Sequence, residues 1–476
     1  MIQTFFSRLL DIIEILSWSC LVFGGSYYSF LTIFTLKSKG FLASNRPNKR
    51  PAPNRVDDDL LPGVTLAMPA YNEEVVIVGC VTSALASDYP NVEVIVVSDG
   101  SKDRTIEVVI EAFEMERDTG IHGTDHIHTK HIRAVYRSTK EPRLLLIDKD
   151  PSGAKADGIN CAINFSRMPW VAIMDADELL NRDTLRKCMT EAVHTPGNVV
   201  CVGTTLLPTN EGNIVDFEMI EARVARNKWV GFQIVEYLSA FMSSRPGQAA
   251  FHALTFVSGG FGLYRRDVLL LVDGQKHGSL GEDLDLATRV HRYMRDNKIP
   301  YEFVQVPEAI VWTEFPFTKA VLQRQRLRWH RGLREIMNDY KDLILRPKYG
   351  KFGMISLGQM FLFEWCAPII EGIGYAVLAT LLLAGRVTPV MAFSMWMMSQ
   401  SFGTLMSVLS VSIASKYVDV YRRTSDRMWL LMWAILMQFG YRQLTLYWRL
   451  MSFRTPKVKG WGEMTRAGFG PTPAKK

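Results

Sequence analysis

The chain has 476 residues, of which 48% are hydrophobic, and a formal net charge of +7. This length suits two or three domains, or one domain joined to membrane helices. The six cysteines are scattered without a Cys-x-x-Cys pair, which excludes a disulfide framework and fits a reducing compartment. Basic residues gather at the flanks of apolar segments and not among stacking aromatic residues, so the sequence indicates no nucleic-acid partner.

The first predicted element is a transmembrane helix within residues 1–36. Residues 16–36 carry no charge and are numerous enough to cross a bilayer core of about 30 Å. A basic, proline-containing linker at 37–59 follows, and cationic flanks stay on the cytosolic side of a membrane. The N-terminus shows no secretory signal pattern. We therefore expect residues 60–350, which contain no second span, to form a cytosolic domain.

The first part of this domain alternates short apolar strands with helical patterns, including an expected helix over residues 103–117. Such alternation predicts a mostly parallel sheet covered by helices. Ligands bind such sheets beyond the carboxyl ends of the strands. The polar residues that follow predicted strands are Asn72, Glu73, Asp99, Asp175 and Asp177. Their recurrence predicts a binding site at this edge.

Asp175 and Asp177 directly follow an apolar strand, where two like charges repel each other. Mg²⁺ or Mn²⁺ takes oxygen ligands from one or two carboxylates together with substrate phosphates, so this pair predicts a metal site. The alternative is neutralisation by solvent. A second metal hypothesis concerns four histidines within residues 122–131. A solvated loop is favoured there, because no cysteine or acidic ligand set accompanies the histidines.

Two further residues of the predicted edge are Asp99 and Lys155. Asp99 has an ordinary Asp-Gly turn as its alternative interpretation. Lys155 follows a Gly-Ala turn and opens a predicted helix, which is a suitable place for a cation to meet a phosphate. Each signal is weak alone.

Glu282 and Asp283 open a predicted amphipathic helix. Acids at a helix N-terminus are favourable for electrostatic reasons alone, and the functional hypothesis is that one of them is a general base. Arg328 and Trp329 lie in a basic segment just before the next apolar region. This segment is either a flank for lipid headgroups, or a site where Arg328 stabilises a leaving phosphate and Trp329 stacks on a sugar.

Residues 351–450 are predicted to form a C-terminal membrane region, followed by a basic cytosolic tail at 451–476. The protein is therefore expected to be a multi-pass protein of the cell membrane. Within the region we predict an interfacial helix from 352, a span at 369–385, a span at 389–415, and a re-entrant or interfacial segment at 428–450.

Taken in order, the segments YNE, SDGS, GAKADGIN, DADE, SGGFG, GED and QRLRW resemble the inverting family 2 glycosyltransferases, whose catalytic domain has the GT-A fold. The resemblance covers residues 60–335. The sequence most resembles the membrane-embedded group of this family, which includes cellulose, hyaluronan, chitin-oligomer and poly-N-acetylglucosamine synthases. The resemblance implies an α/β GT-A domain, Rossmann-like, joined to transmembrane helices.

The resemblance also implies roles for individual residues. Asp283 would be the catalytic base, and Glu282 would orient the site. The diphosphate would bind through Mg²⁺ or Mn²⁺ held by Asp175 and Asp177. The nucleotide-sugar would be held by Tyr71, Glu73, Asp99, Lys155 and Asp175, and the diphosphate and acceptor end by Gln325, Arg328 and Trp329.

This sequence departs from the family pattern in reading SDGS where many relatives have Asp-Asp-Gly-Ser. The implied activity is transfer from a UDP-sugar, with glucose or N-acetylglucosamine favoured, to a growing β-linked polysaccharide or oligosaccharide. Two alternatives stay open: transfer of one sugar to a membrane lipid, and a membrane-anchored binding protein with the same fold. Three or four spans are few for enclosing a polymer channel, so a homo-oligomer or an export partner is compatible with the sequence.

Overall fold

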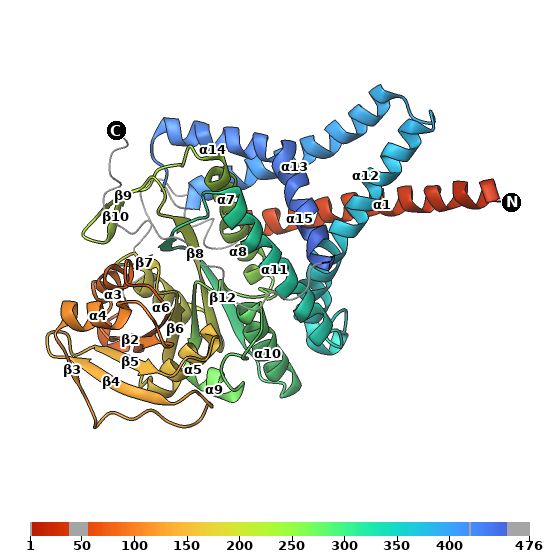
Figure 1. The fold of residues 1–476 in the computed structure, drawn as a ribbon. Coiled ribbons are helices and arrows are strands. Elements are labelled where there is room, and N and C mark those ends of the chain that lie inside the picture. The colour runs from red at the N-terminus through yellow and green to blue at the C-terminus, as the bar shows by residue number, and fades with distance from the viewer. Residues whose placement is uncertain (1, 38–55, 418–419, 455–476) are drawn as a thin grey trace.

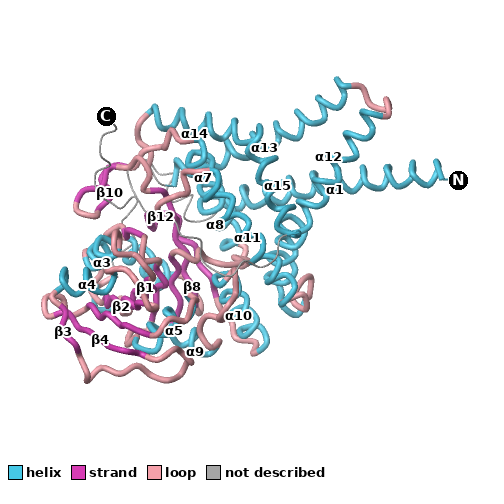
Figure 2. Tube along the Cα trace, in the orientation of Figure 1, coloured by secondary structure: helices cyan, strands magenta, loops and turns pink. Residues whose placement is uncertain are grey.

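The computed structural model describes residues 2–37, 56–417 and 420–454. The predicted linker at 37–59 lies mostly outside these residues, and so does the predicted tail at 451–476. The chain forms two lobes (Figure 1). One lobe contains the strands with helices packed on them, and the other consists of helices (Figure 2).

The central sheet has ten strands in the order β3-β4-β5-β2-β1-β6-β11-β8-β12-β7. A separate two-stranded hairpin joins β9 (Asn213–Val215) and β10 (Glu218–Glu221). The strands of the central sheet are β1 (Val64–Ala70), β2 (Val92–Ser98), β3 (Met115–Arg117), β4 (Ile132–Ser138), β5 (Leu144–Lys149), β6 (Trp170–Met174), β7 (Glu178–Leu180), β8 (Val199–Pro208), β11 (Phe261–Arg265) and β12 (Glu302–Thr313).

The expected α/β class is confirmed, but the sheet is mixed. The neighbours β5, β2, β1 and β6 run parallel, as predicted, and β12 runs parallel to β8. The pairings of β3 with β4, β4 with β5, β6 with β11, β11 with β8 and β12 with β7 are antiparallel. The parallel block brings the carboxyl ends of β1, β2 and β6 to one edge, which positions the predicted acids.

Alternate residues of each central strand enter two separate cores, as the period of two of a strand requires. In β2, Val94 and Val96 belong to the core that includes α3, α4 and α6, whereas Ile95 and Val97 belong to the core that includes α5, α9 and α10. The helices are α3 (Ile77–Leu85), α4 (Thr105–Phe113), α5 (Lys155–Phe165), α6 (Thr184–His194), α9 (Arg266–Leu271) and α10 (Glu282–Asp296), with short 3₁₀ turns η1 (Asp58–Leu60) and η3 (Pro347–Tyr349).

The predicted helix over residues 103–117 is shorter in the structure. It begins at Thr105, whose backbone N–H donates to Asp103 at 3.0 Å, and it ends at Phe113. Glu114 has a positive φ of 48°, which stops the helix. The next three residues instead pair with β4 as strand β3, so a local helical pattern yields here to the sheet.

The helical lobe contains α1 (Ile2–Lys37), α7 (Lys228–Ser239), the π-helical turn η2 (Ala240–Ser244), α8 (Arg245–Ala250), α11 (Lys319–Asp339), π-helical turns η4 (Phe352–Leu357) and η5 (Met360–Cys366), α12 (Ala367–Leu383), α13 (Pro389–Tyr417), α14 (Thr424–Leu436), π-helical turn η6 (Met437–Tyr441) and α15 (Arg442–Arg454). The segment at 428–450, predicted to be re-entrant or interfacial, is bent at Gly440, whose φ of 95° interrupts the helix between α14 and α15.

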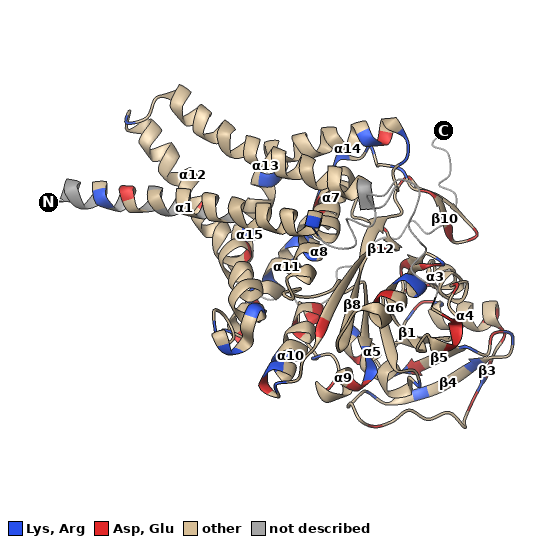
Figure 3. Ribbon diagram, turned by 180° about the vertical axis from the view of Figure 1, so that it is seen from behind, with Lys and Arg blue, Asp and Glu red and all other residues tan. Residues whose placement is uncertain are grey.

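Two helical stretches among the described residues are long and apolar enough to cross a membrane, Phe352–Leu383 and Pro389–Ser415. They cover residues 369–383 of the span predicted at 369–385 and all of the span predicted at 389–415. Most of α12 and α13 carries no charged side chain (Figure 3). Helix α1, with 36 residues, has the length to cross a bilayer but is not one of these two stretches. The predicted N-terminal span therefore stays a prediction.

Candidate active site

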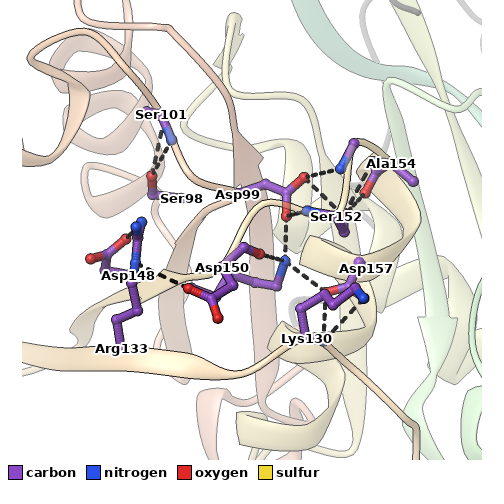
Figure 4. A network of polar contacts seen from close by, with 12 residues as sticks. Ser98, Asp99, Ser101, Lys130, Arg133, Asp148, Asp150, Ser152, Ala154 and Asp157 are labelled. Carbon is purple, nitrogen blue, oxygen red and sulfur yellow. Dashed lines mark hydrogen bonds and ion pairs between the residues drawn. The ribbon is translucent and has the colours of Figure 1, made fainter. Parts of the chain in front are cut away.

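A buried lysine organises the carboxyl end of β2. Asp99 follows β2 and forms an ion pair with Lys149, the last residue of β5. The Lys149 side chain is fully buried, and its Nζ lies 2.7 Å from Asp157 Oδ1. Asp99 also accepts hydrogen bonds from the backbone N–H of Ser152 at 3.1 Å and of Gly153 at 3.2 Å (Figure 4). Asp99 therefore fixes the turn that precedes α5.

The loop after β1 packs beside this turn. Tyr71 is 50% exposed, so its ring is open to a ligand. The backbone N–H of Glu73 donates to Thr105 Oγ1 at 2.8 Å, and Asn72 Oδ1 accepts from the backbone N–H of Lys102 at 2.8 Å. These bonds hold Asn72 and Glu73 at the same sheet edge as Asp99.

Asp175 is neutralised by a protein cation. Lys155, the first residue of α5, forms an ion pair with Asp175, and its Nζ donates to the carbonyl of Gly259 at 2.8 Å. Burial opposes the charged form of this lysine, but the carboxylates of Asp175 and Glu282 outweigh it and raise the pKa of Lys155. The strand-end acid thus already has a counter-ion within the chain.

Two more carboxylates follow Asp175. Asp177 is 9% exposed, and Glu178, the first residue of β7, is 1% exposed. Glu178 Oε2 is buried and has no hydrogen-bond partner among the described residues. Burial, followed by the charges of Asp175 and Asp177, raises the pKa of Glu178 well above its usual range. A side chain at Gly260 would clash with Glu178 Oε1, so the glycine makes room for this acid.

The acidic pair at the start of α10 meets this cluster. Burial raises the pKa of Glu282, and the charges that act on it most strongly are those of Lys155, Asp283 and Arg328. An added Cβ at Gly259 would lie 3.2 Å from Asp283 Oδ2, so Asp283 faces the loop whose carbonyl accepts from Lys155. The structure therefore brings Lys155, Asp175, Glu282 and Asp283 together, although they come from three separate segments.

Helix α11 reaches the site through a close helix contact. An added Cβ at Gly332 would lie 2.9 Å from the backbone nitrogen of Gly281, which caps α10. Because Arg328 lies one turn before Gly332, this contact carries its guanidinium towards Glu282. Gln325 lies on the same helix, and its Oε1 is buried without a hydrogen-bond partner among the described residues.

Trp329 is 38% exposed and is held from one side by Arg326, whose guanidinium carbon lies 4.6 Å from the ring centre. Arg326 Nη2 is 2.5 Å from Glu236 Oε2 on α7. The hydroxyl of Tyr441 donates to the same oxygen at 3.1 Å. The predicted acceptor tryptophan is thus connected to the bend between α14 and α15.

The sequence did not single out Lys149, Glu178, Glu236 or Arg326 as site residues. In the printed sequence, the signal for Lys149 is a lysine flanked by two aspartates at a strand end, and the signal for Glu178 is a third acid directly after the Asp175 and Asp177 pair. Among the described residues, no three or more His, Cys, Asp and Glu side chains are arranged to hold a metal. The histidines of 122–131 belong to these described residues and form no such group. Those histidines are exposed, as a solvated loop requires.

Residues 170–451, more than half of the chain, match the family model described as glycosyl transferase family group 2, and residues 65–271 match the model described as glycosyl transferase family 2. The poly-beta-1,6-N-acetyl-D-glucosamine synthase of Staphylococcus aureus strain COL is 23% identical over 310 residues, which are 65% of this chain and 63% of that relative. The chain thus spans less than two thirds of this relative. The synthase of Staphylococcus epidermidis is 21% identical over 375 residues, which are 79% of each chain.

Among solved structures, the mannosyltransferase PcManGT from Pyrobaculum calidifontis, in complex with GDP-Man and Mn²⁺, superimposes with a TM-score of 0.54. The identity is 17%, and the match covers 90% of this chain and 99% of that chain. This likeness agrees with the GT-A fold that the sequence resemblance implied.

Proposed function

Because this chain belongs to glycosyl transferase family 2, we propose that it transfers a sugar from a UDP-sugar, with inversion, to a growing β-linked polysaccharide at the cytosolic face of a membrane. The observation that carries the proposal is the meeting of Lys155, Asp175, Asp283 and Arg328 at one sheet edge, beside the helical lobe. The relatives support N-acetylglucosamine as the donor sugar, since their names specify a polymer of it.

The reaction joins the acceptor hydroxyl oxygen to the anomeric carbon as the bond from that carbon to the diphosphate breaks. Asp283 takes the proton of the hydroxyl, and the electron pair of the broken bond leaves with UDP. Glu282 faces the cations Lys155 and Arg328, so Asp283 is the better placed of the two for the acceptor. Lys155 and Arg328 stabilise the negative charge that develops on the diphosphate. This scheme needs no covalent enzyme intermediate.

A divalent metal fits the residues present. Two carboxylates together with substrate phosphates suffice for Mg²⁺ or Mn²⁺, and Asp175 and Asp177 are the carboxylates that would hold it. The buried, unsatisfied oxygen of Glu178 beside Asp175 and Asp177 indicates an acidic cluster that favours positive charge, of which Lys155 supplies part. When bound, the metal supplies positive charge at the diphosphate. The PcManGT complex contains Mn²⁺ as well as GDP-Man, which supports this assignment.

The second candidate is transfer of one sugar to a membrane lipid. It is favoured by one observation: α11, which carries Trp329, lies close in sequence to the apolar stretch Phe352–Leu383. An exposed aromatic face also suits the apolar face of an all-equatorial sugar, which supports the polymer.

The test uses the purified chain with a panel of UDP-sugars and Mg²⁺ or Mn²⁺, followed by mass spectrometry of the product. The expected result is release of UDP from one donor and a ladder of sugars without lipid. A single sugar on an extractable lipid would support the second candidate. Absence of turnover with every donor would contradict both and favour a binding protein.

A further inference from the structure

One arginine near the site takes no part in the ion pairs described above. Arg245 begins α8, directly after the π-helical turn η2. Its guanidinium carbon lies 4.2 Å from the ring centre of Phe241 and 4.7 Å from that of Phe256. Its Nη1 is buried and has no hydrogen-bond partner among the described residues. A buried charged donor without a partner is destabilising, so it calls for a ligand or another explanation.

Arg245 is placed near Asp283 by the segment on which its guanidinium packs. Phe256 lies three residues before Gly259, where an added Cβ would lie 3.2 Å from Asp283 Oδ2. Burial lowers the pKa of Arg245 to about 10, and Asp283 is the first of the charges that oppose this shift. Arg245 therefore lies on the side of Asp283 that is covered by η2, α8 and the segment after α8.

This side is also the one towards helix α1. The hydroxyl of Thr35 donates to the carbonyl of Ser243 in η2. An added Cβ at Gly247 of α8 would lie 2.5 Å from the carbonyl oxygen of Leu31. The segment that carries Arg245 thus packs on the end of α1, and it lies between Asp283 and the predicted N-terminal span.

On the basis of the proposed function, we propose that Arg245 is an acceptor-binding residue whose Nη1 donates a hydrogen bond to an oxygen of the acceptor sugar beside Asp283. The ligand class is a neutral, hydroxyl-rich saccharide, because the adjacent Asp283 carboxylate repels an anion. Contacts of the guanidinium with the rings of Phe241 and Phe256 restrict the direction of its donors.

The test compares Arg245→Gln and Arg245→Lys with the wild type as full chains, with an N-acetylglucosamine tetramer as the acceptor probe. Loss of a charged donor is expected to raise the KM for the tetramer by about 10-fold or more. The affinity for UDP and the rate of donor hydrolysis by water stay unchanged. The lysine variant keeps the charge but lacks the planar fork, so it recovers only part of the acceptor affinity.

Arg295→Gln is the matched control. Arg295 lies at the other end of α10, its guanidinium carbon is 5.4 Å from the ring centre of Tyr301, and its Nε is buried without a partner among the described residues. Arg295→Gln removes a similar cation–π contact that lies far from Asp283. This substitution should therefore change the melting temperature but not the KM for the tetramer.

The outcomes separate the inference from the proposed function. An unchanged KM for the tetramer, in an Arg245→Gln protein that still hydrolyses the donor, overturns the inference alone. Loss of UDP affinity in this variant also overturns it, because it assigns Arg245 to the diphosphate side. If the wild type hydrolyses no UDP-sugar, the proposed function fails. Direct binding of the tetramer to the wild type and the variant then still decides the role of Arg245.

Discussion

The two sides of the candidate site differ in how their polar groups are matched. On the donor side, Lys149 lies between Asp99 and Asp157, and Lys155 is paired with Asp175. The exception on this side is Glu178 Oε2, beside Asp175, which has no hydrogen-bond partner among the described residues. On the acceptor side, the buried polar atoms Gln325 Oε1 and Arg245 Nη1 have no hydrogen-bond partner among the described residues, and the Trp329 ring is 38% exposed.

This difference indicates two kinds of preorganisation. Matched charges hold a rigid pocket, which suits a nucleotide that is released intact after each transfer. Unmatched donors and acceptors are satisfied only by a ligand, which suits a saccharide that offers hydroxyl groups. Donor-side changes should therefore affect UDP binding or folding, whereas acceptor-side changes should affect acceptor use.

The largest effect is expected at the strand-end acids. Asp175→Asn or Asp177→Asn removes an anionic ligand but keeps the shape, so each should abolish sugar transfer and metal-dependent UDP binding. Isothermal titration of UDP with and without Mn²⁺ measures the binding. Asp183→Asn, which alters an exposed pair with Lys187, should leave both unchanged. Near-normal turnover in both site variants would contradict the metal assignment.

The strand-end acids were predictable because the carboxyl ends of parallel strands meet at one sheet edge. Lys149 was not predictable, because a lysine at the end of an apolar strand indicates a strand end that is exposed to solvent. Its burial depends on Asp99, which is 50 residues away, and on Asp157 of α5. Tertiary closure, not local pattern, therefore creates this part of the donor side.

The acceptor side was less predictable for the same reason. Glu282, Asp283, Arg328 and Trp329 carried a local signal, because each lies at a helix end or in a basic segment. Arg245 follows a π-helical turn that no simple period predicts, and it meets Asp283 only through the folded chain. The mixed character of the sheet was also not predicted. Antiparallel strands such as β11 alternate with helices along the chain in the same way as parallel strands do.

The second largest effect concerns folding. Lys149→Met should destabilise the protein by about 3–5 kcal/mol, because it leaves Asp99 and Asp157 buried without their cation. Thermal or denaturant unfolding measures the loss. Lys140→Met removes an exposed partner of Glu114, at 3.8 Å, and should leave stability unchanged. Equal stability of the two variants would show that the buried lysine is dispensable.

The third effect tests the base. Asp283→Asn should slow transfer by about 10²-fold or more, the usual scale for general base catalysis, with UDP affinity retained. Glu282→Gln should have a milder effect, because this residue faces the cations and orients the site. Steady-state transfer rates and UDP titrations check both. A severe loss in Glu282→Gln beside a mild one in Asp283→Asn would reverse the assignment.

The smallest effect is expected where the acceptor side meets the helical lobe. Tyr441→Phe removes the hydrogen bond to Glu236 but keeps the ring, whose centre lies 4.7 Å from the ring centre of Phe232. Glu236 then holds Arg326 less firmly, and Arg326 supports the Trp329 ring. One hydrogen bond to a charged group contributes about 1.5–3 kcal/mol, and only part of this loss reaches Trp329 through Arg326. The acceptor KM should therefore rise about 2- to 10-fold, with UDP affinity unchanged.

The control is Tyr421→Phe, because the Tyr421 hydroxyl has no hydrogen-bond partner among the described residues. A double-mutant cycle sharpens the test, since Tyr441 and Arg326 contact the same oxygen of Glu236. The effects of Tyr441→Phe and Glu236→Gln on the acceptor KM should therefore be non-additive. Additive effects, or a change in UDP affinity, would show that the bend between α14 and α15 does not act on the acceptor side through Glu236.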